Sequence, residues 1–134
     1  MAHVRSLAVV FALLSLACSR ATTETRDVSA GQNVQLGVGE SATVTPGAVR
    51  VQFAAVNDSR CPSDVVCIQA GDAMIILALS GAGADRTDTL YLVRQPRSVS
   101  YGGYRFDAVN VQPYPRTTDQ SPAKTLELHV ATAP

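Results

Sequence analysis

The sequence predicts an all-β fold, either an antiparallel β-sandwich or a small Greek-key barrel of about seven to eight short strands. Apolar and polar residues alternate with a period of two along much of the chain, which is typical of half-buried strands. Turn signals such as Pro46-Gly47 and Gly102-Gly103 separate most of these segments. After the N-terminal region, no long segment shows the helical period. A chain of 134 residues is expected to form one domain.

Eight segments carry the strand pattern. They are expected at residues 33–38, 41–45, 49–55, 73–79, 87–93, 98–101, 104–111 and 124–131. Residues 49–55 alternate most clearly, with the valines and the phenylalanine on one face. Residues 73–79, AMIILAL, are apolar on both faces, so we expect a central strand covered on both sides. The Gly-Gly pair at 102–103 predicts a hairpin.

Residues 1–17 have the features of a secretory signal peptide. Arg5 precedes an uncharged apolar run, Leu7 to Ala17, which is shorter than the roughly 20 residues of a bilayer-spanning helix. The end of this run, LSLAC at residues 14–18, resembles the lipobox of bacterial lipoproteins, whose cysteine is lipid-modified. This resemblance implies a lipid anchor on Cys18. The alternative is an ordinary signal peptide, which leaves a soluble periplasmic or secreted protein.

The remaining chain is expected to contain a tether and one domain. Residues 18–27 comprise the lipidated cysteine and a polar, threonine-rich tether, and residues 28–134 form the β-sandwich domain. Ser19 follows the cysteine where many Gram-negative lipoproteins retained at the inner membrane have Asp. By this resemblance we expect an exported lipoprotein that faces the periplasm, with the outer membrane favoured.

Charge and composition exclude some classes of partner. The chain has 11 basic and 11 acidic residues, and one basic residue, Arg5, lies in the signal peptide, so the exported part is nearly neutral. It has no basic patch, and nucleic acid is therefore not expected as a partner. Tryptophan is absent and aromatic residues make up 5%, which argues against an aromatic-rich sugar-binding surface.

Cys61 and Cys67 suggest three alternatives: a metal site, a redox pair or a disulfide. Structural zinc needs four ligands, and His129 and Cys18 are the only further Cys or His residues after the signal peptide. A redox pair is typically C-x-x-C at a helix start, whereas this spacing is longer and no helix is expected. An exported chain enters an oxidising compartment. We therefore expect a Cys61–Cys67 disulfide and no metal.

The loop at residues 58–72 is the candidate contact surface, because binding residues are often found on loops held by a rigid scaffold. Its candidate contact residues are Asp58, Arg60, Asp64 and Gln69. Three aspartates, including Asp72, offer oxygen ligands for Ca²⁺, but their spacing matches no EF-hand loop. Asx-turn and solvated-loop roles are commoner for such residues.

Two stretches of the chain resemble a group of small exported bacterial proteins. Residues 58–62, DSRCP, and 66–73, VCIQAGDA, resemble a D-S-R-C-P-x-x-V-x-C-I-W-A-G-x-A loop. Residues 104–106, YRF, and 109–115, VNVQPYP, resemble the PYP strand ending of the same proteins. Gln69 stands where their pattern usually has Trp. The resemblance implies a β fold and export, and it carries over no catalytic residue.

The sequence indicates no enzymatic activity. It contains no G-x-S-x-G, no Gly-rich phosphate loop and no H-E-x-x-H. His129 is a conceivable general base, although an exposed strand residue is the simpler interpretation. Asp107 and Glu127 are conceivable paired carboxylates, but nothing in the sequence brings them together. We expect no enzyme and no cofactor.

The leading functional hypothesis is a non-enzymatic envelope lipoprotein whose β-domain has a binding or accessory role. Its expected partners are the membrane, through the N-terminal lipid, and an envelope protein or a small ligand. The alternative is a secreted inhibitor-like or ligand-binding module that uses loop 58–72 as its contact surface.

Overall fold

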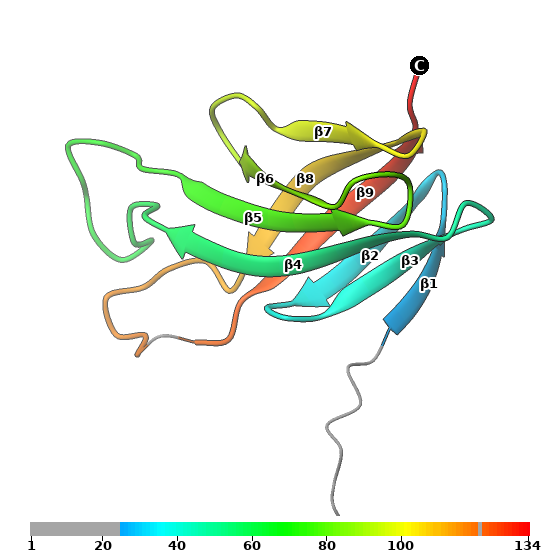
Figure 1. Cartoon of the computed structure of the whole chain (residues 1–134). Helices are drawn as coiled ribbons and strands as arrows, with labels where there is room; N and C mark the ends of the chain where they lie inside the picture. Colours follow the sequence, from blue (N-terminus) through cyan, green and yellow to red (C-terminus); the bar gives the residue numbers. More distant parts are fainter. Residues whose placement is uncertain (1–24, 121) are drawn as a thin grey trace, which may run out of the picture.

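The computed structural model describes residues 25–120 and 122–134, and it places nine strands in two sheets (Figure 1). The strands are β1 (Thr25–Ser29), β2 (Gln32–Gly37), β3 (Ser41–Thr45), β4 (Val49–Asp58), β5 (Ala73–Ser80), β6 (Arg86–Tyr91), β7 (Ser98–Tyr101), β8 (Tyr104–Gln112) and β9 (Thr125–Thr132). One sheet has the order β1-β3-β4-β5-β6 and the other β2-β9-β8-β7. The described residues contain no helix. The all-β prediction is therefore confirmed, in its β-sandwich form.

Strand β1 was not expected from the sequence. Residues 25–27, expected as the end of the polar tether, belong to this strand, and the domain therefore begins before residue 28. Only Val28 of β1 is buried, so an edge strand of this kind leaves no alternating pattern to detect. β1 also pairs in parallel with β3, whereas all other neighbouring strands in the described sheets are antiparallel.

The core lies between the two sheets and consists of the inward-facing residues of their strands. Val49, Val51 and Phe53 of β4 are fully buried, as are Leu126 and Leu128 of β9. Each such side chain stabilises the fold by about 1.5–3 kcal/mol when it leaves water. Alternation in the sequence thus reports the inner face of each strand, and the two inner faces form one hydrophobic cluster.

Strand β5 differs from its prediction. Ala73, Ile75 and Leu77 on its inner face are buried, but Met74 and Ile76 on its outer face are only half-buried. The expectation that both faces of this segment are covered is therefore wrong. β5 lies between β4 and β6, so its main chain is paired on both sides while its outer face forms part of the molecular surface.

The strand directions gather four connections at one end of the sandwich. These are residues 38–40, 59–72, 92–97 and 113–124, of which residue 121 is not described. We call this end the loop end; it lies on the left in Figure 1. Short turns at residues 30–31, 46–48, 81–85 and 102–103 form the opposite end. Because β1 is parallel to β3, and β3 is antiparallel to β4, β1 begins on the side where β4 ends.

Candidate functional site

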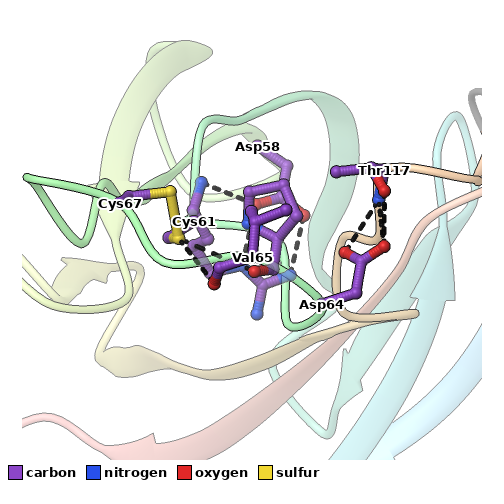
Figure 2. Close-up of a disulfide and its surroundings, with 8 residues drawn as sticks. Asp58, Cys61, Asp64, Val65, Cys67 and Thr117 are labelled. Carbon is purple, nitrogen blue, oxygen red and sulfur yellow. Dashed lines mark hydrogen bonds and ion pairs between the residues drawn. A yellow bond between two sulfur atoms is a disulfide. The ribbon is translucent and has the colours of Figure 1, made fainter.

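The disulfide closes the loop between β4 and β5, as the sequence predicts. Cys61 and Cys67 are bonded, with their Cα atoms 5.9 Å apart (Figure 2). The loop comprises residues 59–72 and lies at the loop end of the sandwich. The two cysteines thus form a structural crosslink in this part of the chain.

Main-chain hydrogen bonds close the base of the loop beneath the disulfide. The Ser59 amide donates to the Asp72 carbonyl at 2.9 Å, and the Cys61 amide donates to the Ala70 carbonyl at 2.7 Å. Gly71 has φ +68°, and a Cβ there would lie 1.8 Å from the Ser59 carbonyl oxygen. Only glycine permits this close approach of the two sides. The loop therefore leaves the sheet as a narrow, hydrogen-bonded neck.

A buried ion pair at the base of the loop joins it to the sandwich. Arg60 donates to both carboxylate oxygens of Asp58 at 2.7 Å, and also to the Val111 carbonyl at 2.9 Å. The Asp58 and Arg60 side chains are each only 6% exposed. Lys124 Nζ lies 2.9 Å from Asp58, and the Arg60 guanidinium lies 4.4 Å from the centre of the Tyr114 ring. Both predicted contact residues are therefore inside the structure, where they join the loop to β8 and to residues 113–124.

These partners favour the ionised form of Asp58. Burial acts to raise the pKa of Asp58, but hydrogen bonds from Arg60 and Lys124 outweigh it and the pKa lies below its ordinary value. The carboxylate therefore stays ionised at neutral pH. Removal of the Asp58 carboxylate would leave the buried Arg60 guanidinium without its acidic partner.

The Asp72 carboxylate binds a second connection, residues 92–97. Its Oδ1 accepts hydrogen bonds from the amides of Ala73, Leu92 and Val93 at 2.8, 3.1 and 3.0 Å, and its Oδ2 accepts one from the Arg94 amide at 3.1 Å. Burial acts to raise the pKa of Asp72, but these backbone donors lower it below its ordinary value. The carboxylate thus fixes residues 92–97 to the neck of the disulfide loop.

Asp64 attaches the loop to the β8–β9 connection. Its carboxylate accepts hydrogen bonds from the Thr117 amide, at 3.0 Å, and from the Thr117 hydroxyl (Figure 2). These hydrogen bonds lower the pKa of Asp64, which is exposed. The Ser63 amide donates to the Pro115 carbonyl at 3.0 Å. The disulfide loop therefore rests against residues 113–124 through both main chain and side chains.

The outer surface of the loop is aliphatic. Val66 and Ile68 are fully exposed, at 100% and 105% of their reference areas, and Val65 is also exposed. Gln69, the fourth predicted contact residue, is exposed beside them. The four predicted contact residues are all polar or charged, and the aliphatic residues beside them were not predicted. The signal was the VVCI run at 65–68, apolar residues within a segment already assigned to a loop.

The exposed apolar residues of the molecule gather at the loop end. Seven large hydrophobic side chains are exposed in the described part of the chain, and six of them lie in its four connections. We call these six the apolar cap: Val38, Val65, Val66, Ile68, Val93 and Tyr114. The seventh, Val109, lies in β8 at a register shift between Ala108 and Asn110. Large exposed apolar groups rimmed by polar residues are typical of interaction sites.

A groove beside the loop has an ion pair in its wall. It has a volume of about 640 Å³ and lies between residues 37–40, the end of β4 and residues 115–125. Asp58 and Lys124 contribute to its wall and form an ion pair. Lys124 also donates to the Pro113 carbonyl at 2.7 Å, so its ammonium group is engaged by the protein itself.

The residues considered for catalysis lie on the outer face of the four-stranded sheet. His129 Nδ1 is 2.6 Å from Asn33 Oδ1, and Glu127 accepts a hydrogen bond from the Asn33 amide group at 2.7 Å. Asp107 is the register partner of His129 and forms an ion pair with Arg105 at 3.0 Å. The topology thus brings the candidate acid–base residues onto one face, where hydrogen bonds and an ion pair within the protein engage them.

Within residues 25–120 and 122–134, no three His, Cys, Asp or Glu side chains come together as a metal ion would require. The same residues include no helix with the length and apolarity needed to cross a membrane. Cys18 and the expected signal peptide lie outside the described residues.

No protein-family model, curated protein or solved structure matches the chain.

Proposed function

We propose that this chain is a non-enzymatic lipoprotein of the bacterial cell envelope, in which the β-sandwich is a binding or accessory domain. Its contact surface is the loop end, with the disulfide loop at the centre. The observation that carries this proposal is the concentration of exposed apolar side chains in the four connections of that end. Burial of such side chains against another surface is favourable in proportion to the apolar area removed from water.

The rigidity of the disulfide loop supports a contact role. The loop is closed by a disulfide, joined to β8 by Arg60, attached to residues 113–124 by Asp64 and held to residues 92–97 by Asp72. A surface that is already ordered loses less conformational entropy when it binds than a flexible one does. Val66 and Ile68 are therefore presented to a partner in a fixed arrangement.

The lipid anchor of the proposal is supported by the sequence at residues 14–18, LSLAC. It is tested by labelling cells with radioactive palmitate. The expected result is a labelled protein whose label is lost in the Cys18→Ala variant, with Cys61 and Cys67 unchanged. Equal labelling of both proteins, or no label in either, would contradict the anchor and favour the alternative of a secreted module that contacts a ligand through the same loop.

The contact surface is tested in intact cells with a photo-crosslinking amino acid. It is placed at position 68, in the loop, or at position 84, in an exposed turn of the opposite end. We expect crosslinked adducts, to protein or to lipid, from position 68 and none from position 84. Equal yields from both positions would show that the loop end is not a specific contact surface.

A further inference from the structure

The first described strand, β1, begins on the side of the loop end. Thr25, the first residue of β1, pairs with Ser41 of β3, and Ser41 pairs with Gln52 of β4. From this level, β4 continues through six further residues to Asp58, where the disulfide loop begins. At the usual rise of a strand this distance is about 20 Å. The loop thus projects from the sandwich in the direction from which β1 enters.

The length of the preceding chain limits how far the domain can lie from a lipid on Cys18. Six residues, 19–24, lie between Cys18 and Thr25. The seven steps of a fully extended chain from Cys18 to Thr25 span at most about 25 Å. The start of β1 must therefore lie within this distance of the membrane surface. Since the neck of the disulfide loop lies about 20 Å from that level, on the side where β1 begins, the loop end can reach the bilayer within the length of this chain.

We propose that the outer part of the apolar cap, Val65, Val66 and Ile68 of the disulfide loop, rests in the interfacial region of the bilayer that holds the Cys18 lipid. This inference depends on the proposed anchor and names the surface that the loop end contacts. An isolated contact of a few aliphatic side chains with lipid is weak. The anchor keeps the loop at a high local concentration beside the membrane, so a weak contact is sufficient.

The chemistry of the cap favours lipid over a specific protein partner. Five of its six residues are Val or Ile, which have no hydrogen-bonding side chain. The nearby carboxylates of Asp58, Asp64 and Asp72 are engaged by groups of the same protein. A bilayer needs no directional hydrogen bonds from the surface that enters it, whereas specific protein interfaces usually include several.

The opposite end supports the same orientation. Its turns contain small and polar residues, such as Gly81-Ala82-Gly83-Ala84-Asp85 and Gly102-Gly103. None of the exposed large hydrophobic side chains of the described residues lies in these turns. The asymmetry between the ends is that of a domain with one face on a membrane and the other in water.

The test uses tryptophan fluorescence, because the chain has no tryptophan of its own. The full chain is expressed as Ile68→Trp or as the matched control Ala84→Trp, both at exposed positions. The protein is purified, its lipid is verified by mass spectrometry, and it is reconstituted into phosphatidylcholine vesicles. We expect the emission of Ile68→Trp to shift to shorter wavelength and to be quenched by brominated lipids, with no change for Ala84→Trp.

Other results of this experiment would distinguish a failure of the membrane contact from a failure of the proposed anchor. A verified lipidated protein whose Ile68→Trp emission is unchanged on vesicles would overturn the membrane contact and leave the proposed anchor intact. Equal quenching of both variants would also overturn it, because no particular end would face the lipid. A shift that depends on protein concentration without vesicles would assign the cap to a second copy of the chain. Absence of lipid on Cys18 would overturn both proposals.

Discussion

Single residues at the loop end determine how the connections are held together. Asp72 accepts four backbone hydrogen bonds, and Asp58 pairs with Arg60 and Lys124. The sequence shows these charges, but it cannot show partners such as Lys124 that lie far away along the chain. For that reason Asp58 and Arg60 looked like contact residues, whereas the structure buries them.

Replacement of Asp72 by Ala tests this role. At neutral pH we expect the free energy of unfolding to fall by at least about 2 kcal/mol, because four backbone amides, one buried and three partly buried, lose their acceptor. Urea unfolding at a series of pH values measures the effect. Asp64→Ala is the control: its carboxylate is exposed, and the loss of unfolding free energy should be clearly smaller. Equal losses in the two variants would contradict the role given to Asp72.

The contribution of Asp72 to the free energy of unfolding depends on pH in a defined direction. The pKa of Asp72 is lower in the folded protein than its ordinary value of 3.8. Its ionised form therefore stabilises the fold above that value, and this contribution is lost as the pH falls through the lowered pKa. The difference in unfolding free energy between wild type and Asp72→Ala should therefore become smaller at acidic pH. A difference that stays constant down to strongly acidic pH would contradict the assignment.

Gly71 gives a second prediction at this scale. Gly71→Ala places a Cβ against the Ser59 carbonyl, whereas Gly31→Ala, also at positive φ, places it in open space. We expect Gly31→Ala to cost about 1–2 kcal/mol of unfolding free energy from backbone strain alone. Gly71→Ala should cost clearly more, because the neck of the loop must open. Thermal or urea unfolding compares the two, and similar losses would show that the neck is not closely packed.

At the scale of elements, alternation predicts strands well where one face is buried. All eight expected segments are strands in the structure, with shifts of a few residues at their ends. Alternation fails at β1, which buries one residue, and at the outer face of β5, where apolar residues are only half-buried. A register shift in β8 places the apolar Val109 outside the core, between buried Ala108 and half-buried Asn110. Local patterns cannot reveal a parallel edge strand or the position of such a shift.

The disulfide of the loop is expected to stabilise the fold by a defined amount. The Cys61→Ser, Cys67→Ser double variant should lose about 2–2.5 kcal/mol of unfolding free energy, the value expected from chain entropy for a loop of this size. It should still fold, because the contacts of Asp58 and Asp72 do not need the crosslink. Urea unfolding with and without reductant measures this loss, and reductant should not affect the variant. A variant that cannot fold would show that the ion pair and hydrogen bonds do not hold the loop.

At the scale of the whole molecule, the two ends of the sandwich differ. One end carries the apolar cap, the disulfide loop and the side from which β1 enters. The other carries short turns of small and polar residues. The sequence predicted the fold class and the disulfide, but the gathering of Val38, Val66 and Val93 at one end depends on strand order and direction. Residues far apart along the chain meet there only in the folded protein.

The central claim is that the loop end is covered in the cell envelope and open in the isolated domain. Hydroxyl-radical footprinting with mass spectrometry measures this directly, because it compares the same side chains in both states without a substitution. We predict that Val66 and Ile68 are oxidised readily in the purified, detergent-free protein and are protected in intact envelopes, while Val109 is oxidised equally in both. Equal oxidation of Val66 and Ile68 in the two samples would contradict the account.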